Sequence, residues 1–251
     1  MVHFVGAGCG APDLITVRGA KLLSQADVVI YAGSLVNPEL LESTKPGCEK
    51  HDSAGMTLEQ IVEIIRTAET EGKTTVRLHS GDPSIYGAVR EQFDALEKIG
   101  IAYDVCPGVS ALSGAAAALK TEYTVPEISQ TLILSRMEGR TPVPAKERIR
   151  FLASHRASMA LFLSAGLLEG LQNELLAGGY EKDTPAAIVY KASWPDERIV
   201  RCRLDELKEA GEKNHIRSTA LVLVGRFLGD AKARSRLYDP SFATGFREAE
   251  P

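Results

Sequence analysis

The chain has 251 residues, of which 44% are hydrophobic and 25% charged, so it can bury a sizeable core as one large domain or two small ones. Its formal net charge of -4 provides no basic field for nucleic acid, and any acidic ligand must be held by locally placed cations. The four cysteines are scattered without metal-type spacing, so we expect no metal site and no disulfide framework, and a reducing cytoplasm fits best.

The N-terminal region is predicted to begin with a strand over residues 2–6, with neither a signal peptide nor a membrane span. A Gly-rich loop (residues 6–16) follows, and a helix begins at about Thr16. Because Pro12 and Asp13 separate the glycines from the helix, the spacing differs from a dinucleotide fingerprint. The loop is either a tight surface turn or a cover for a ligand. Three glycines in five positions favour the ligand cover, because they cost backbone entropy and bring no evident gain in packing to a plain surface turn.

Strand and helix patterns then alternate through the first half of the chain. Strands are predicted over residues 27–31, 49–52, 74–78 and 101–105, and helices over residues 57–68, 89–96 and 111–119. This alternation predicts an α/β fold with a mostly parallel sheet.

A Gly-Asp-Pro corner ends the central strand. Asp82 is predicted to cap a helix whose first residue is Pro83, and taken alone it could be no more than a cap. The neighbouring Gly81 and Pro83 favour a second role, because they leave room for a ligand against the main chain. A similar corner follows the next strand at residues 106–110. Both corners are expected at the carboxyl edge of the sheet, where α/β proteins bind ligands.

The second half predicts another α/β domain that is richer in hairpin pairing. Its strands are expected over residues 131–135, 158–163, 187–190, 198–201 and 220–225, with helices over residues 145–153, 167–177 and 204–211. The alternation weakens between Lys120 and Glu127, so we predict domains over residues 1–122 and 123–229. Residues 230–251 are predicted to form a loosely held tail.

A basic loop over residues 136–144 leaves the first strand of this second domain. Such a run is often a solvated charged segment. Its glycine and two prolines restrict its shape, however, and its arginines suit carboxylate binding.

Three motifs in order, at residues 5–19, 81–87 and 107–110, resemble the tetrapyrrole methyltransferases that use S-adenosylmethionine. The resemblance extends to about Phe227. Within that family, residues 32–37, 139–144 and 190–197 are similar to the branch that methylates C11 of precorrin-4, or its cobalt form, in corrin biosynthesis.

The resemblance implies a tetrapyrrole methylase fold of two α/β domains with the cofactor in a cleft between them, and a homodimer. It also implies S-adenosylhomocysteine as a product. The positions that match the family's cofactor contacts are Pro12, Ser80, Gly81, Asp82, Ile85, Ser110, Ala111, Leu163, Ala187 and Ala220. Ser80 departs from the pattern, because many relatives carry a second glycine there.

The predicted reaction is methyl transfer to C11 of precorrin-4 or cobalt-precorrin-4, giving the corresponding precorrin-5. The expected partners of the substrate's acidic side chains are Arg77, Arg136, Arg140 and Lys191. His79 and Tyr86 are candidates for proton handling, although His79 could be a strand-end residue and Tyr86 a packed ring. Two alternatives stay open: methylation of another ring carbon of a corrin precursor or uroporphyrinogen, and an NAD-binding regulatory module.

Overall fold

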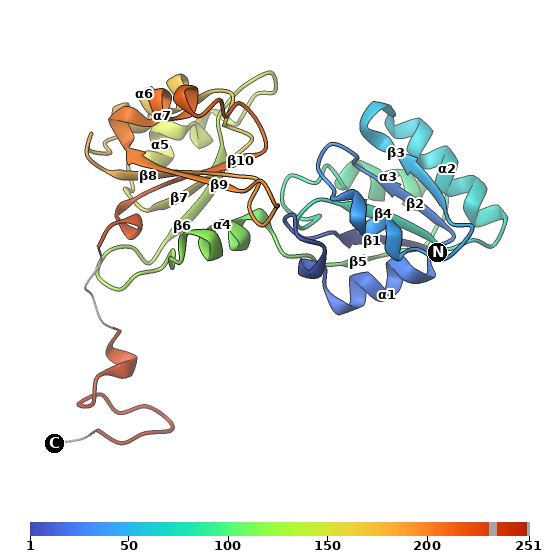
Figure 1. The fold of residues 1–251 in the computed structure, drawn as a ribbon, viewed down its shortest axis with the longest axis horizontal. Helices are drawn as coiled ribbons and strands as arrows, with labels where there is room; N and C mark the ends of the chain where they lie inside the picture. The colour runs from blue at the N-terminus through green and yellow to red at the C-terminus, as the bar shows by residue number, and fades with distance from the viewer. Residues whose placement is uncertain (231–234, 250–251) are drawn as a thin grey trace. The chain divides into compact units, whose positions relative to one another are not determined.

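The computed structural model describes residues 1–230 and 235–249 and contains two five-stranded sheets (Figure 1). Its internal contacts divide the chain into two compact units. The N-terminal unit comprises Met1–Ala115 and Lys191–Glu197, and the C-terminal unit comprises Ala116–Tyr190 and Arg198–Pro251. Each unit contains one of the sheets, which confirms the α/β class predicted from the sequence.

The sheet of the N-terminal unit is entirely parallel, as its sequence predicts, and its strand order is β3-β2-β4-β1-β5. The strands are β1 (Val2–Gly6), β2 (Val28–Tyr31), β3 (Glu49–Asp52), β4 (Thr75–His79) and β5 (Tyr103–Cys106). Val5 of β1 is in register with Leu78 of β4 and Cys106 of β5. The three loops that leave these strands therefore start side by side at one edge of the sheet.

Three helices cover the two faces of this sheet: α1 (Val17–Gln25) lies on one face, and α2 (Leu58–Thr70) and α3 (Arg90–Lys98) lie on the other (Figure 1). Leu23 of α1 packs in the cluster that contains Val5 and Leu78. Ile65 of α2 and Leu96 of α3 pack in a second cluster, around Phe4. The loops after β1 and β4 thus lead to opposite faces, which is the arrangement of a ligand-binding switch point.

Helices α1 and α2 begin at residues whose side chains cap the first backbone N–H groups of the helix. The Thr16 hydroxyl accepts the backbone N–H of Gly19 at the start of α1, and Thr57 forms a capping box with Gln60 at the start of α2. Short 3₁₀ turns complete this unit: η1 (Pro12–Leu14), η2 (Pro38–Ser43) and η3 (Ser53–Gly55).

The sheet of the C-terminal unit has the order β6-β7-β10-β8-β9. Its strands are β6 (Leu132–Arg136), β7 (Ser158–Phe162), β8 (Pro185–Tyr190), β9 (Arg198–Arg203) and β10 (Ala220–Val224). Only the β6–β7 pair is parallel, and the other three pairs are antiparallel. The prediction of more hairpin pairing in the second half is therefore confirmed.

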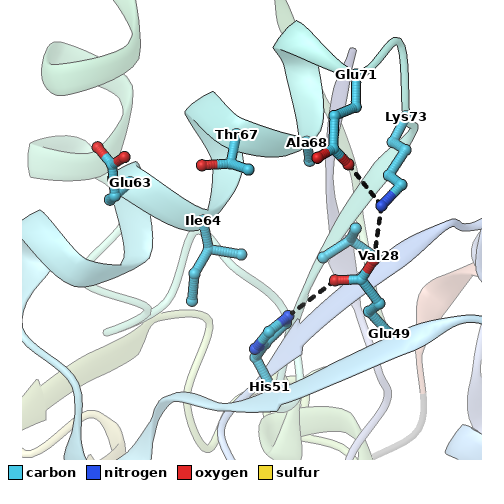
Figure 2. Close-up of a pocket in the computed structure, with 9 residues that line it drawn as sticks. All are labelled: Val28, Glu49, His51, Glu63, Ile64, Thr67, Ala68, Glu71 and Lys73. Carbon is cyan, nitrogen blue, oxygen red and sulfur yellow. Dashed lines mark hydrogen bonds and ion pairs between the residues drawn. The ribbon is translucent and has the colours of Figure 1, made fainter.

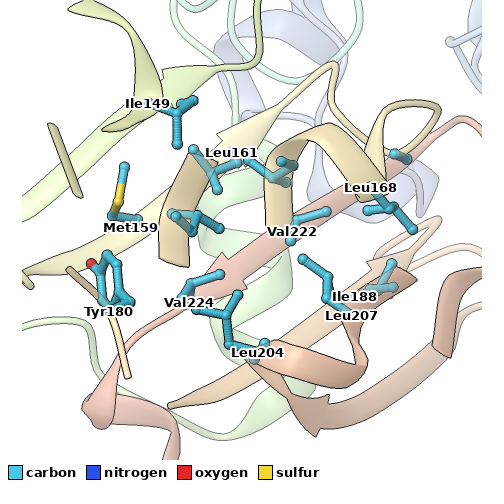
Figure 3. Packing of buried hydrophobic residues seen from close by; sticks show 14 of the residues in the cluster. Ile149, Met159, Leu161, Leu168, Tyr180, Ile188, Leu204, Leu207, Val222 and Val224 are labelled. Atoms are coloured by element: carbon cyan, nitrogen blue, oxygen red, sulfur yellow. The ribbon is translucent and has the colours of Figure 1, made fainter. Parts of the chain in front are cut away.

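The core of the C-terminal unit lies between this sheet and its helices (Figure 3). The helices of this unit are α5 (Ile149–Ala153), α6 (Leu168–Ala177) and α7 (Leu207–Lys213), while α4 (Ala111–Leu119) is divided between the two units. The 3₁₀ turns are η4 (Ala145–Glu147), η5 (Leu204–Glu206), η6 (Arg226–Leu228) and η7 (Arg236–Tyr238). Leu171 and Leu207 are fully buried against Ile188 and Val222 of the sheet. Burying each such side chain contributes roughly 1.5–3 kcal/mol, so this packing holds the sheet and helices together.

The division between the units differs from the predicted boundary between residues 122 and 123. It falls inside α4, at Ala115 and Ala116, and it assigns Lys191–Glu197 to the N-terminal unit. In the sequence this segment lies between two strands of the second sheet, β8 and β9, so strand spacing alone assigns it to the second domain. Its side chains instead contact the Gly-rich loop.

The predicted tail contains a small self-contained loop. The Arg247 guanidinium donates hydrogen bonds to the carbonyls of Leu237, Asp239 and Phe242. Residues 231–234 and 250–251 of the predicted tail lie outside the described residues. Within residues 1–230 and 235–249, no helix combines the length and the apolar character needed to cross a membrane.

Candidate functional site

The loops after β1 and β4 are joined by backbone hydrogen bonds at the carboxyl edge of the N-terminal sheet. The Ala7 N–H donates to the His79 carbonyl at 2.7 Å. Gly8 and Gly81 then form an isolated antiparallel bridge, in which the Gly81 N–H donates to the Gly8 carbonyl at 2.7 Å. The Gly-rich loop and the Gly-Asp-Pro corner therefore form one continuous backbone surface.

Glycines allow the third loop, after β5, to pack directly on this surface. A Cβ built on Gly6 would lie 2.5 Å from the Gly108 Cα, and one on Gly108 would lie 2.2 Å from the Gly81 carbonyl oxygen. Only glycine permits such close backbone contact. The three loops thus meet at Gly6, Gly81 and Gly108.

Asp82 ties two of these loops together. One carboxylate oxygen accepts the Gly108 N–H at 2.8 Å, and the other accepts the backbone N–H of Ser84 at 2.9 Å and the Ser84 hydroxyl. Burial opposes ionisation of this carboxyl, but the hydrogen bonds from Ser84 and Gly108 outweigh burial, so the pKa of Asp82 is lowered. The site therefore carries a fixed negative charge at neutral pH.

The prediction that Asp82 caps a helix is wrong. Asp82 caps a single turn, in which the Ile85 N–H donates to its carbonyl, and α3 begins only at Arg90. Tyr86 and Ala88 have φ values of 54° and 48°, which a helix cannot accommodate. The Gly-Asp-Pro corner is therefore followed by a strained loop, and the Tyr86 side chain is 43% exposed on it.

Seven of the ten predicted cofactor contacts lie in the N-terminal unit. Pro12 begins η1, and the Ser110 hydroxyl accepts the Leu112 N–H at the start of α4. The seven residues are Pro12, Ser80, Gly81, Asp82, Ile85, Ser110 and Ala111. Six of them belong to the loops that follow β1, β4 and β5, and Ala111 begins α4 directly after the third loop.

The other three predicted cofactor contacts lie in the C-terminal unit. Leu163 follows β7 with a φ of 53° and is 68% exposed. Ala187 is fully buried within β8, and Ala220 begins β10. Leu163 is thus available to a ligand, whereas the Ala187 side chain is fully buried.

Two of the predicted site residues, Arg77 and His79, are buried in the core. The Arg77 guanidinium donates to the Gln92 side-chain oxygen at 3.0 Å and to the Ile30 carbonyl at 3.2 Å, and burial lowers its pKa to about 10. These bonds argue against the predicted contact with a substrate carboxylate. Sequence could not indicate them, because Arg77 alternates with apolar residues like any strand residue.

His79 stacks on Phe4 with a ring distance of 5.9 Å, and its Nε2 is buried without a hydrogen-bond partner. Burial, reinforced by the positive charge of Arg77, lowers the pKa of His79 to about 3. The ring is therefore neutral at physiological pH, which argues against the predicted proton exchange.

Of the remaining predicted cations, Arg140 is exposed, and Arg136 and Lys191 are half-buried. The Arg136 guanidinium bonds the carbonyls of Thr141 and Pro142, so it shapes the basic loop, and Arg140 is exposed on that loop. The Lys191 ammonium pairs with Asp196 at 2.7 Å and lies 5.4 Å from the centre of the Trp194 ring. Arg140 and Lys191 are thus accessible to an acidic ligand, and Arg136 acts on the loop that presents Arg140.

Sequence reasoning missed the side chains that hold the Gly-rich loop from outside. The buried Asn37 amide donates to the Gly10 carbonyl at 3.0 Å. The Ser193 hydroxyl accepts the Ala11 N–H at 3.0 Å and lies 3.3 Å from the Cys9 sulfur. Neither residue carries a local signal for this role, because each pairing joins segments distant in the sequence.

A cavity of about 210 Å³ lies elsewhere in the N-terminal unit, next to α2 and β3 (Figure 2). Its acidic side chains are paired: Lys73 bonds Glu49 and Glu71 at 2.6 Å each, His51 lies 3.7 Å from Glu49, and Glu63 pairs with Arg66 outside the lining. Since Val28 and Glu49 begin their strands, the cavity belongs to the opposite edge of the sheet from the three loops.

The fold and the site define an α/β protein in which three loops meet at one edge of a parallel sheet. The surface there consists of backbone and glycine with one ionised carboxylate, Asp82, and its glycine-rich loop lacks the spacing of a dinucleotide-binding loop. The model of the tetrapyrrole (corrin/porphyrin) methylases matches residues 1–208. The chain belongs to this family.

Individual relatives agree with this assignment. The cobalt-precorrin-4 C(11)-methyltransferase of Methanocaldococcus jannaschii is 50% identical over 249 residues, which cover 99% of this chain and 96% of the relative. A solved cobalt-precorrin-4 methyltransferase superposes with a TM-score of 0.89 at 47% identity, covering 91% of this chain and 95% of that one. Uroporphyrin-III C-methyltransferase from Thermus thermophilus, solved with S-adenosylhomocysteine, gives a TM-score of 0.76 at 29% identity, covering 90% and 92% of the two chains.

Proposed function

We propose that the protein transfers a methyl group from S-adenosylmethionine to C11 of precorrin-4, and that the cobalt-bearing form is its substrate. The observation that carries this proposal is the similarity, over nearly the whole chain, to a relative named for that reaction. The product is then the corresponding cobalt-precorrin-5, a step of corrin biosynthesis. The four cysteines are free thiols, which suits the reducing cytoplasm we propose for it.

The ligand edge of the N-terminal unit fits the methyl donor. A Cβ on Gly81 would make ordinary contact with the backbone of Ser110 and Ala111 at 3.6–3.7 Å, and the φ of 62° at Gly81 favours glycine, which keeps the main chain bare beside the proposed ligand position. Asp82 supplies a negative charge suited to a donor that carries a sulfonium and an ammonium group. Its oxygens are already bonded to Ser84 and Gly108, so we assign it two roles, holding the loops and balancing charge.

S-adenosylmethionine supplies an activated methyl group whose transfer removes the positive charge of the sulfonium. The protein's part is then to align the two reactants and to exclude water, and a strong base is not required. The partly reduced ring provides an enamine-like carbon nucleophile. Tyr86 stays in the proposal as a hydrogen-bonding group near the ring, because its side chain is exposed beside the Gly-Asp-Pro corner. His79 is left out, because its buried ring is neutral.

The acidic side chains of the tetrapyrrole need cations. We assign this role to Arg140 and Lys191, with Arg136 shaping the basic loop. A guanidinium can bind a carboxylate through two parallel hydrogen bonds, which fixes the orientation of the ring as well as its affinity. The family resemblance also leads us to propose a homodimer.

The test is incubation of the purified protein with carbon-13 methyl-labelled S-adenosylmethionine and either cobalt-precorrin-4 or metal-free precorrin-4. We expect mass spectrometry to show the addition of one methyl group and carbon-13 NMR to show the label at C11. Methylation should be faster with cobalt-precorrin-4 than with metal-free precorrin-4. Label at another carbon would favour methylation of a different ring position. A faster reaction with metal-free precorrin-4 would make the metal-free form the preferred substrate. Binding of NADH instead of S-adenosylhomocysteine in calorimetry would contradict methyl transfer and favour the nucleotide-binding alternative.

A further inference from the structure

The connection between β8 and β9, Lys191–Glu197, packs within the N-terminal unit and against the Gly-rich loop. It is held in an uncommon backbone shape, because Lys191 and Ser193 have φ values of 47° and 67°. Non-glycine residues rarely adopt such values, and they persist where surrounding contacts impose them. The shape of this segment therefore depends on its contacts.

Its internal hydrogen bonds form a closed turn. The Ser193 N–H donates to the Glu197 carboxylate at 2.7 Å, and the Trp194 N–H donates to the Lys191 carbonyl at 3.0 Å. The Lys191–Asp196 ion pair closes the same turn from its outer side. The segment thus has a defined shape from which to contact its neighbour.

Ser193 and Trp194 make the contacts with the Gly-rich loop. The Ser193 hydroxyl accepts the Ala11 N–H at 3.0 Å and lies at hydrogen-bond distance, 3.3 Å, from the Cys9 thiol. A Cβ on Gly10 would lie 2.2 Å from the Trp194 ring, so the ring fits against the loop only because residue 10 is glycine. Three consecutive loop residues, Cys9 to Ala11, are therefore contacted by one segment.

Two further contacts hold the Gly-rich loop. A Cβ on Gly114 of α4 would lie 2.6 Å from the Cys9 sulfur, so that glycine leaves the space that Cys9 occupies. The Asn37 amide bonds the Gly10 carbonyl. The part of the loop directly before Pro12 is thus contacted by α4, by Asn37 and by the Lys191–Glu197 segment.

We propose that Lys191–Glu197 is a strap that holds the Gly-rich loop in its ligand-binding shape, with Ser193 as the positioning residue. This inference rests on the proposed use of S-adenosylmethionine. Ser193 acts through the loop, and removal of its hydroxyl leaves the Ala11 N–H without its acceptor and the Cys9 thiol without its partner.

The variants Ser193→Ala and Ser193→Gly test the role of the hydroxyl. Glycine accepts the left-handed backbone more readily than alanine, so a shared defect in both variants reports the hydroxyl and not backbone strain. Ser24→Ala is the matched control, because Ser24 is exposed on α1 and bonds only its own helix, at Lys21. Cys9→Ser keeps a hydrogen-bonding group opposite Ser193 and is the conservative variant.

Two readouts separate the strap from the proposed function. Hydrogen exchange of a peptide spanning residues 7–15, measured without ligand, should become faster in both Ser193 variants and stay unchanged in Ser24→Ala. Affinity for S-adenosylhomocysteine should fall about five- to tenfold in both Ser193 variants, as expected for one lost hydrogen bond, and by less in Cys9→Ser.

Unchanged exchange in the Ser193 variants overturns the strap, whatever the ligand. Unchanged affinity in either Ser193 variant, with a wild-type protein that binds S-adenosylhomocysteine, overturns its role in ligand binding. If the wild-type protein does not bind S-adenosylhomocysteine, the proposed function is overturned, and with it the strap's role in holding this ligand. The hydrogen-exchange experiment still decides whether the strap orders the loop.

Discussion

The carboxylate of Asp82 accepts the backbone N–H of Gly108 at 2.8 Å, across 26 positions of the sequence. This bond joins the loop after β4 to the loop after β5, on either side of the loop that leaves β1. The same carboxylate caps the turn at Ser84. One side chain thus joins two of the three loops that meet at this edge.

Replacement of Asp82 by Asn should weaken both ligand binding and stability. An Asn side chain offers one acceptor oxygen and an NH₂ donor, and the donor must face either the Gly108 N–H or the Ser84 donors. We expect the free energy of unfolding to fall by about 1–3 kcal/mol, the typical cost of an unsatisfied or lost hydrogen bond to a charged group. Urea unfolding and calorimetric titration with S-adenosylhomocysteine measure the two effects.

The control for this substitution is Asp94→Asn on α3, where the carboxylate pairs with Arg90 at an exposed position. That change should leave both measurements close to wild type. Equal effects of the two substitutions would contradict the role of Asp82 in joining the loops.

Substitution of Gly108 by Ala tests the close contact of the loops. Its Cβ would lie 2.2 Å from the Gly81 carbonyl oxygen, a backbone atom that cannot move without displacing the Gly-Asp-Pro corner. We expect a loss of stability of about 1–3 kcal/mol, as for other overpacked sites, and a large loss of affinity for S-adenosylhomocysteine. Gly55→Ala is the control, because nothing lies within 4 Å of its Cβ position. Wild-type affinity in Gly108→Ala would show that the ligand does not use this edge.

The sequence was sufficient to predict that the glycine-rich loop and the two corners share one edge of the N-terminal sheet. Alternating strands and helices imply a parallel sheet, and a parallel sheet brings the residues after its strands to one edge. The positions of Gly81, Asp82 and Ser110 follow from this rule alone. The helix after Asp82 was predicted wrongly, because capping residues mark a turn as readily as a helix, and left-handed conformations at Tyr86 and Ala88 have no sequence signal.

The sequence could not show whether a polar side chain near the end of a buried strand points into the core or toward a ligand. Arg77 and His79 alternate with Val76 and Leu78, and in a fully covered sheet both faces are buried. Polar residues on such a strand therefore enter the core when a partner such as Gln92 is available. The strap was missed for a different reason, since its contacts join residues more than 180 positions apart.

Replacement of Arg140 by Ala should separate substrate binding from donor binding. The side chain is exposed on the basic loop, and loss of one charge-assisted contact to a carboxylate should weaken tetrapyrrole binding about tenfold or more. Affinity for S-adenosylhomocysteine should stay at the wild-type value. Arg203→Ala is the control, because Arg203 is an exposed arginine of the C-terminal unit that bonds Asp205. Equal loss of both affinities in Arg140→Ala would contradict this separation of roles.

The buried His79 should make the protein less stable in mild acid. The folded ring keeps its pKa at about 3, whereas the ring in the unfolded chain binds a proton below its ordinary value of 6.5. Unfolding therefore takes up a proton between these values, and stability falls as the pH is lowered through this range. At pH 5 the loss amounts to about 2 kcal/mol.

The variant His79→Leu should remove this part of the pH dependence. Urea unfolding at pH 7.5 and pH 5 should give a smaller difference in this variant than in the wild type, while His155→Gln, at an exposed position, should keep the wild-type difference. The same pH dependence in His79→Leu and the wild type would show that His79 is not a buried neutral ring.

Enlarging residue 10 (Gly10→Ala) and truncating residue 194 (Trp194→Ala), singly and together, tests the packing of the strap on the Gly-rich loop. In Gly10→Ala the new Cβ would lie 2.2 Å from the Trp194 ring and 2.7 Å from the Ala192 carbonyl oxygen. We expect a clear loss of affinity for S-adenosylhomocysteine in this variant and a smaller loss in Trp194→Ala. The double variant should be less impaired than the sum of the two, because the clash with the ring is removed.

Full recovery is not expected, since the Ala192 carbonyl still lies near the added methyl group. A double-mutant cycle should give a coupling of about 0.5–3 kcal/mol, the range for residues in contact. The control pairs Gly10→Ala with Tyr103→Ala, whose ring packs on Phe93 in another part of the unit, and those effects should add. Additive effects of Gly10→Ala and Trp194→Ala would mean that the ring does not rest on the loop, and the strap would then have to hold it through Ser193 alone.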